Sequence, residues 1–380
     1  MKKSLIALLV ATLPAAAFAD VTIYGKIKGG VEYNDNGVTK QTNIDDLGSR
    51  IGFKGAEDLG SGLKAIWQVE TGFGIDGTGT GSSSGTFANR NSFLGLQSNL
   101  GTLRFGNVSN FLDSDMGTVD TWEYNSNALG LGIFTRDATR LKNSVRYDLP
   151  AVVPGLTAAL QYGAKETKGQ ASADRETYNL GLGYENSGFF GKYNYSHESK
   201  AVSSVAVVVD KATGKIESVG VVDANHTAVA SFAQNDTANE KHRLEVGYNA
   251  NNLFVGFGYQ QAKGGLDVVG SAWGNQVIAG FAVPNGQTIS ANGKVKTREY
   301  ALTAGYTFGA ITPKFTYAHG DKVEVGGVKL DNTQYDQYVL GADYAVSKRT
   351  TIGAQYGQIA VKGTGNNDLK SFGLNMVHAF

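Results

Sequence analysis

The sequence predicts an all-β fold, a 16-stranded antiparallel transmembrane β-barrel, and three observations lead to this prediction. Polar and apolar residues alternate over segments of about ten residues, which is typical of strands with one apolar face. The composition favours strands, with 51 glycines, 5 prolines, 18 tyrosines and 18 phenylalanines among 380 residues. Short turns and long polar connections also alternate along the chain.

The first residues have the pattern of an export signal. Lys2 and Lys3 precede an apolar run that ends at Leu13, and Ala17-Phe18-Ala19 has the small residues of a cleavage site. The apolar run is too short for a helix that spans a bilayer. We therefore expect residues 1–19 to be a signal peptide and residues 20–380 to form one barrel domain.

The composition also argues against several classes of protein. The chain has 34 basic and 34 acidic residues, so it has no bulk attraction for nucleic acid. It has no cysteine, and its five histidines lack metal-ligand spacing. We find no convergent serine, histidine and acid set, and we expect no enzyme activity, cofactor or metal. Since no apolar run beyond the signal is long enough for a membrane helix, a membrane role requires a closed barrel.

The first predicted strand, residues 21–33, shows the alternation clearly. In a barrel its apolar face would contact lipid and its polar face would contact a hydrated lumen. The apolar face holds Val21, Ile23, Ile27, Val31 and Tyr33, and the polar face holds Thr22, Lys26, Lys28 and Glu32.

The same pattern predicts sixteen strands joined by seven short turns and eight long connections, with both termini on the short-turn side. The predicted strands span 21–33, 46–57, 62–71, 89–97, 102–107, 139–149, 156–164, 175–185, 189–197, 240–249, 253–262, 296–308, 311–319, 334–345, 350–361 and 369–380. The predicted long connections span 34–45, 72–88, 108–138, 165–174, 198–239, 263–295, 320–333 and 362–367.

The strand count has two open points. Residues 205–209 and 216–222 form either a hairpin outside the membrane, which we favour, or two further strands. Residues 273–281 are similarly ambiguous.

Aromatic residues near the strand ends are expected to form girdles at the two membrane interfaces, although they could instead be core residues. The candidates are Tyr24, Phe105, Tyr162, Phe254, Tyr306 and Phe315.

Several longer motifs occur along the chain in a fixed order. They lie at 20–26, 49–68, 143–148, 317–320, 335–338 and 341–350, and the chain ends in Phe380. In this order they resemble the Gram-negative general porins of the neisserial and betaproteobacterial type. The resemblance covers nearly the whole chain except 198–239 and 263–295.

This resemblance implies an outer-membrane porin, a water-filled channel for passive diffusion of ions and small hydrophilic solutes. It implies a homotrimer and an inward-folded third extracellular loop that narrows the pore. The implied partners are outer-membrane lipid and lipopolysaccharide, and the barrel-assembly machinery, which would recognise a terminal strand ending in Phe380. No nucleic-acid partner is expected.

The third long connection is the predicted constriction loop, because it is rich in acidic residues. Basic residues on the opposite wall would create a transverse field across the narrowest section. The acidic set is Asp113, Asp115, Asp120 and Glu123, and the basic set implied by the resemblance is Lys26, Arg50, Arg90 and Arg140. Where the family often has Gly-Arg, this chain has Gly106-Asn107, which removes one possible wall charge and leaves the ion preference open, with a lean toward anions.

A second functional hypothesis remains. The large connections 198–239 and 263–295 could belong to a surface-exposed adhesin or binding barrel with little or no channel activity. Conductance after reconstitution into a bilayer distinguishes the two hypotheses.

Overall fold

The computed structural model describes most of the chain. The described residues are 21–77, 87–124, 128–166, 175–200, 204–209, 216–220, 230–233, 237–269, 294–362 and 368–380. The predicted signal peptide and the ambiguous segment 273–281 lie outside these ranges. Within them, no helix is both long enough and apolar enough to cross a membrane.

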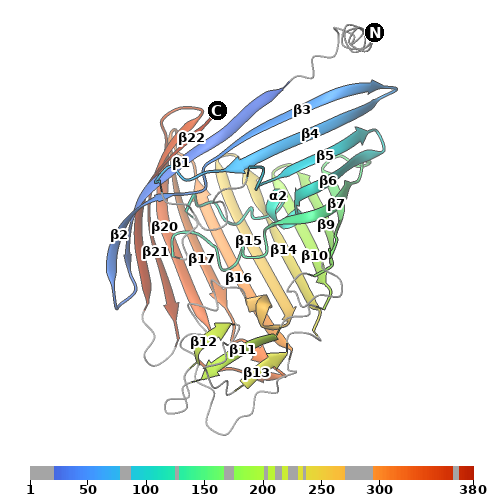
Figure 1. Ribbon diagram of the computed structural model, residues 1–380. Coiled ribbons are helices and arrows are strands. Elements are labelled where there is room, and N and C mark those ends of the chain that lie inside the picture. The colour runs from blue at the N-terminus through green and yellow to red at the C-terminus, as the bar shows by residue number, and fades with distance from the viewer. Residues whose placement is uncertain are drawn as a thin grey trace, which may run out of the picture.

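The described chain forms one antiparallel sheet that closes on itself through pairing of its first and last strands (Figure 1). The first half of the wall contains β1 (Thr22–Asp35), β2 (Lys40–Asp46) with β3 (Arg50–Gly60), β4 (Leu63–Gly72), β5 (Ser92–Ser98), β6 (Gly101–Ser109), β7 (Arg140–Asp148), β8 (Leu156–Gly163) and β9 (Thr177–Asn186). The second half contains β10 (Phe189–Glu198), β14 (Asn239–Ala250), β15 (Leu253–Gly264), β16 (Val295–Tyr306), β17 (Ile311–Gly320), β20 (Tyr335–Ala345), β21 (Thr350–Val361) and β22 (Leu369–Ala379).

These strands confirm the predicted 16-stranded barrel. The sheet has 19 strand segments, but β2 continues the ladder of β3 along β1, and two short segments lie in one connection. These two are β18 (Glu324–Val325) and β19 (Val328–Lys329), within the predicted long connection 320–333. The remaining elements are the 3-10 helix η3 (Leu266–Val269), the short helix α2 (Phe111–Ser114), and β11 (Ser204–Val209), β12 (Ile216–Gly220) and β13 (Ala230–Ala233).

The three strands β11, β12 and β13 form a separate sheet rather than wall strands. Figure 1 places this sheet at the end of the barrel where the long connections lie, opposite the chain ends. The structure therefore favours the hairpin hypothesis over two additional wall strands for residues 205–209 and 216–220, while residues 221–222 of the predicted segment lie outside the described ranges.

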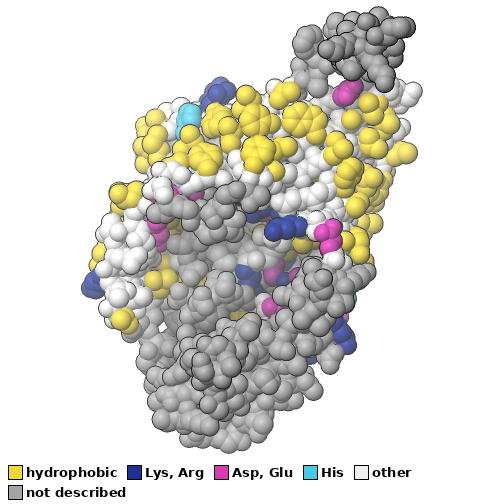
Figure 2. Space-filling view, viewed as in Figure 1, with side chains coloured by type: hydrophobic (Ala, Val, Ile, Leu, Met, Phe, Trp, Pro, Cys, Tyr) yellow, Lys and Arg dark blue, Asp and Glu magenta, His cyan; other side chains and the backbone are white. Residues whose placement is uncertain are grey.

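The wall has an apolar outer face and a polar inner face. Outward side chains such as Ile23 (58% exposed) and Leu340 (61% exposed) contrast with the inward Arg146 (2% exposed) and Glu299 (0% exposed). Figure 2 shows hydrophobic side chains gathered in a band over the part of the barrel where β1, β3 and β4 lie. In water this surface would be costly, whereas in a bilayer it is the required lipid contact.

Some predicted boundaries were wrong. Residues 34–45 were predicted to be a long connection, but β2 occupies 40–46 and only residues 36–39 join it to β1. The predicted strand 89–97 instead begins at Ser92, so Arg90 precedes β5. The polar sequence of β2 hid the strand, because Ile44 is its one aliphatic residue and none of its residues is buried, so no alternation of polar and apolar residues marks it.

Two predicted girdle residues face the interior instead. The Tyr24 hydroxyl donates to Glu70 inside the barrel at 3.0 Å. The Phe254 ring stacks on the buried Phe190 with centroids 6.3 Å apart. The other four candidates, Phe105, Tyr162, Tyr306 and Phe315, are exposed on the outer face as predicted.

Candidate functional site

The connection between β6 and β7, residues 110–139, begins with the short helix α2. Asn110 caps this helix by accepting a hydrogen bond from the Asp113 backbone N–H at 2.9 Å. Phe111 packs over Gly181 of β9, where a Cβ atom would overlap the ring. The glycine therefore lets the helix lie directly against the wall strand.

After α2, side chains of β14, β16 and β17 bind the backbone of the 110–139 segment. Glu245 accepts from the Thr118 N–H at 2.8 Å, and the Thr303 hydroxyl donates to the Val119 carbonyl at 2.5 Å. Lys314 donates to the Thr121 carbonyl at 2.6 Å. Since these bonds satisfy buried backbone groups, they fix the path of the segment along this wall.

The same pattern continues on β20 and β21. Gln337 donates to the Gly130 carbonyl at 2.8 Å, and Gln355 donates to the Leu129 carbonyl at 2.6 Å. A Cβ atom at Gly357 would collide with the backbone of Ala128. The segment therefore contacts the second half of the barrel from β14 through β21.

Buried ion pairs complete this attachment. Arg136 donates to the Glu299 carboxylate on β16, with one Nη2–Oε1 distance of 2.9 Å. Lys241 of β14 lies 2.8 Å from Asp137 and 2.7 Å from Glu198. A buried ion pair is costly to break, because the remaining charge is left without its partner.

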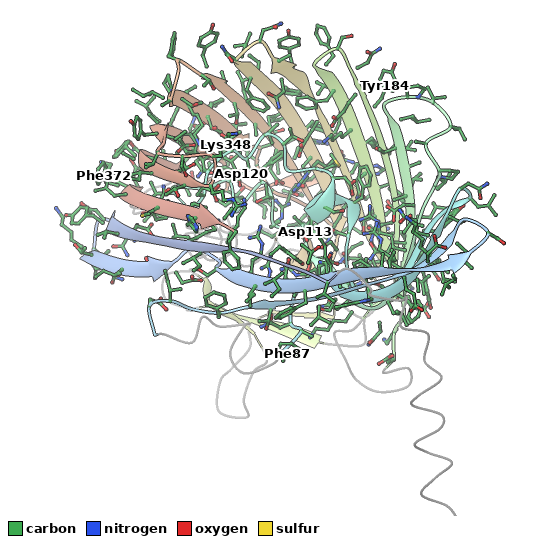
Figure 3. The ribbon with its side chains drawn as sticks, turned by 90° about the horizontal axis from the view of Figure 1, so that it is seen from above. Phe87, Asp113, Asp120, Tyr184, Lys348 and Phe372 are labelled. Atoms are coloured by element: carbon green, nitrogen blue, oxygen red, sulfur yellow. The ribbon has the colours of Figure 1, made fainter. Side chains whose placement is uncertain are left out.

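The four predicted acidic residues do not line one face. Asp113 pairs with Arg140 at 3.4 Å, and Asp115 pairs with the buried Arg146 at 2.7 Å, both at the base of the segment. Viewed from above, Asp113 and Asp120 lie inside the ring of strands, whereas Tyr184 and Phe372 point away from it (Figure 3).

Asp120 is turned into the segment itself. Its carboxylate accepts hydrogen bonds from the Trp122 and Leu131 backbone N–H groups, both at 3.3 Å. Burial raises the pKa of Asp120 to about 6, although these hydrogen bonds oppose the shift. Asp120 therefore joins two arms of the segment rather than facing a passing solute.

Glu123 contacts the opposite wall. Its carboxylate lies 2.8 Å from Lys28 of β1. Burial raises the pKa of Glu123, but the positive charges of Lys28 and Lys26 outweigh burial, so the pKa lies below the ordinary value. Lys28 was not in the predicted basic set, although its place on the polar face of the first strand was a usable signal.

The predicted basic residues gather on β1, β3, β7 and the approach to β5. Lys26 and Arg50 are direct cross-strand partners on the inner face. Arg140 lies within the electrostatic range of both Arg50 and Arg90. Arg90 is paired with Glu70 of β4 at 2.6 Å. The structure therefore brings all four basic side chains to one side of the lumen.

Lys26 and Arg50 differ from the other two. Within the described ranges, no carboxylate lies within 4.0 Å of either side chain, whereas Arg90 and Arg140 each have one. Like charges placed directly opposite each other on a sheet are destabilising. The Lys26–Arg50 pair therefore costs stability at this position rather than contributing to it.

Asn107 replaces the wall arginine that was expected from the resemblance. Its side-chain amide donates to the Arg90 carbonyl at 2.8 Å and the Asn89 carbonyl at 3.3 Å. Asn107 therefore holds the backbone that carries Arg90.

Phe380 lies at the end of the closing strand. Its backbone exchanges two hydrogen bonds of 3.1 Å with Gly25 of β1. Its ring lies over Gly25, where a Cβ atom would come within 2.6 Å of it. The last residue therefore contributes to barrel closure at the end opposite the long connections.

Comparisons with known proteins agree with this architecture. A family model described as Gram-negative porin matches residues 4–364. The major outer membrane protein P.IB of Neisseria gonorrhoeae is 39% identical over 364 residues, which cover 92% of this chain and 91% of that protein.

Solved structures with this fold are more distant in sequence. The anion-selective porin from Comamonas acidovorans has a TM-score of 0.69 at 20% identity, covering 95% of this chain and 100% of that one. The trimer form of OmpT from Vibrio cholerae has a TM-score of 0.63 at 16% identity, with 95% and 99% coverage.

Proposed function

As a member of the Gram-negative porin family, this chain is an outer-membrane channel for passive diffusion, and we propose that the 110–139 segment and a basic wall set its narrowest section. The wall is formed by Lys26, Arg50, Arg90 and Arg140. A sixteen-stranded barrel is wide enough to leave an aqueous lumen, so the solutes admitted depend on what narrows it.

The contacts of the 110–139 segment support this proposal. The segment binds β14 to β21 through backbone and ion-pair contacts, and it reaches β1 through Lys28 and Glu123. The basic wall lies on the other half of the barrel, on β1, β3 and β7. The remaining opening is therefore bounded by the segment on one side and by cations on the other.

The charges around this opening favour anions. Five basic side chains, Lys26, Lys28, Arg50, Arg90 and Arg140, lie along this side of the opening, and Glu123, Glu70 and Asp113 pair with Lys28, Arg90 and Arg140. The carboxylates of Glu32 and Asp45 lie farther along the same wall, within electrostatic range of Tyr124. The single observation that carries the anion preference is the Lys26–Arg50 pair, whose charges have no carboxylate partner among the described residues. Several such charges over low-dielectric walls can bias ion passage by a few kT.

Planar bilayer recording tests the channel and its preference together. The protein should give large, stepwise conductance, and its zero-current potential in a potassium chloride gradient should have the sign of chloride preference. A potential of the opposite sign would reject the basic constriction. An absence of conductance would favour the alternative of an adhesin or binding barrel.

The partners remain part of the proposal. We infer a homotrimer embedded in outer-membrane lipid and lipopolysaccharide, with no enzyme activity. We also infer that residues 1–19 are removed during export and that the terminal strand ending in Phe380 is recognised by the barrel-assembly machinery. The mass of the mature chain tests the cleavage after residue 19, and the mass of the native assembly tests the trimer.

A further inference from the structure

The tip of the 110–139 segment is fastened where the first and last strands close the barrel. The Tyr124 hydroxyl lies 3.0 Å from the Val31 carbonyl of β1 and 2.8 Å from the Leu374 carbonyl of β22. Val31 and Leu374 are partners across this seam. One hydroxyl proton is therefore shared between the two strands that complete the barrel.

Two glycines make this approach possible. A Cβ atom at Gly373 would lie 2.7 Å from Tyr124 Cζ, and one at Gly30 would overlap the hydroxyl. Tyr124 itself is only 2% exposed. Because the ring occupies the space of two missing side chains, a larger residue at either glycine would displace it.

The interruption between β2 and β3 supplies the third side of this socket. Gly48 has a φ of 95°, and the backbone N–H of Gly48 donates a hydrogen bond to the Asp46 carboxylate at 3.0 Å. This bend turns Leu47 inward, where it packs with Tyr124 and Leu129 in a buried cluster. We call Gly30, Leu47, Leu129 and Gly373 the Tyr124 socket.

The socket also restrains the neighbouring charge. Glu123 directly precedes Tyr124, and its carboxylate contacts Lys28 at 2.8 Å. The Lys28 side chain is 10% exposed and the Glu123 side chain is 33% exposed, so the ammonium is largely removed from water while the carboxylate still meets the lumen. A fixed ring at residue 124 limits where the Glu123 carboxylate can reach, and it keeps the carboxylate on Lys28, from where its charge also acts on Lys26.

We propose that Tyr124 is a positioning residue for ion selectivity: seated in its socket, it holds the Glu123 carboxylate against Lys28 and so fixes how much of the basic wall is neutralised at this point. This inference rests on the proposed constriction. When the tip leaves its socket, the Glu123 carboxylate moves away from Lys28 and Lys26, the distribution of charge across the opening changes, and the permeability ratio changes with it. The barrel seam and the charge of the pore are thereby coupled through one side chain.

Tyr124→Phe tests the proposal, because it keeps the ring and removes the hydroxyl. Loss of one hydrogen bond of about 1 kcal/mol raises the population of undocked tips about fivefold. We expect the fraction of open time spent in conductance substates to rise by about this factor, and the chloride-to-potassium permeability ratio to differ from that of the wild type. The matched control is Tyr338→Phe, since Tyr338 is 45% exposed on the outer face of β20.

Gly373→Ala provides a second variant that acts through space rather than through the hydroxyl. Its control is Gly191→Ala, where the added Cβ meets only Val246 Cγ1, at 3.9 Å. Heat-modifiable mobility on gels verifies that each barrel is folded. If Gly373→Ala does not fold, Tyr124→Phe decides the outcome alone.

Two outcomes overturn the inference. Tyr124→Phe could keep the wild-type substates and permeability ratio, or it could lower only the thermal stability, which a merely structural role predicts. Arg50→Gln, measured in parallel, separates this failure from failure of the proposed constriction. If Arg50→Gln shifts the permeability ratio and Tyr124→Phe does not, only the role of Tyr124 is rejected. If neither variant shifts the ratio, the proposed constriction is rejected as well.

Discussion

Replacing Arg50 by glutamine removes one charge of the Lys26–Arg50 pair, in which neither side chain has a carboxylate partner among the described residues. The substitution keeps a polar side chain on the inner face of β3 and relieves the like-charge contact with Lys26. The barrel should therefore fold normally, and its stability should be unchanged or slightly higher. The expected functional effect is a loss of anion preference.

The size of this effect follows from the electrostatics of the opening. Two unit charges about 5 Å apart in water interact by about 0.8 kcal/mol. Screening with a Debye length of about 10 Å at 0.1 M salt reduces this to about 0.5 kcal/mol. The lost charge acts with opposite sign on anions and cations. The difference between their energies at the opening therefore changes by about 1 kcal/mol, which is about fivefold in the permeability ratio.

The assay is the zero-current potential across a bilayer that separates two potassium chloride concentrations. The control is Lys263→Gln, since Lys263 is exposed and shares the outer face of β15 with Phe257. Raising the salt to 1 M should reduce the difference between Arg50→Gln and wild type, because the Debye length falls to about 3 Å. An unchanged permeability ratio at low salt would refute the assignment of Arg50 to the constriction.

Three further changes test other parts of the structure. Asp120→Asn should abolish a pH dependence of loop docking near pH 6. Because burial raises the pKa of Asp120 to about 6, its contribution to docking is full below the ordinary pKa of an aspartate and is lost as the pH rises through 6. Conductance substates of the wild type should therefore become more frequent from pH 5 to 7, while those of the variant should stay constant. Arg146→Met removes the buried guanidinium that binds Asp115 and Asp148, of which Asp148 keeps its ion pair with Arg104, and should lower the free energy of unfolding by about 1.5–3 kcal/mol, measured by urea unfolding in lipid vesicles. Leu340→Arg places a charge on the lipid-facing side of β20, near the middle of the strand, and should lower the free energy of unfolding by about 2–4 kcal/mol in the same assay. An unchanged free energy of unfolding would contradict the assignment of this face to the membrane.

The strands could be predicted from the sequence because a barrel wall repeats one simple constraint. Every second residue faces lipid, so Ile23, Ile27 and Val31 alternate with Lys26 and Lys28. Glycine-containing turns such as 187–188 then mark where the chain reverses. The constraint weakens beyond the apolar band, which explains why β2 was predicted to be a connection.

Side-chain direction was harder to predict where glycines line the interior. Tyr24 lies over Gly52 of the neighbouring strand β3, and Phe254 lies over Gly256, two residues further along β15, so each aromatic ring packs inside the barrel over a position without a side chain. Composition alone marks such residues as interface aromatics. For Tyr24, only the neighbouring strand, whose register the sequence does not specify, shows that an inward ring has room.

The partners of the acidic residues could not be predicted either. The sequence identified Asp113, Asp115, Asp120 and Glu123 as one set because they share a connection. The structure separates them, because a connection has no period that fixes where each side chain points. Asp120 satisfies backbone N–H groups of its own segment, and Glu123 reaches Lys28 on a strand almost a hundred residues away in sequence.

The zero-current potential of the wild-type protein in a potassium chloride gradient tests the central claim most directly. Since neither Lys26 nor Arg50 has an ion-pair partner in the part of the chain that the structure describes, stepwise conductance should be accompanied by a potential that shows chloride to be the more permeant ion. A potential that shows potassium preference, or a reconstituted barrel that passes no current, would contradict the account.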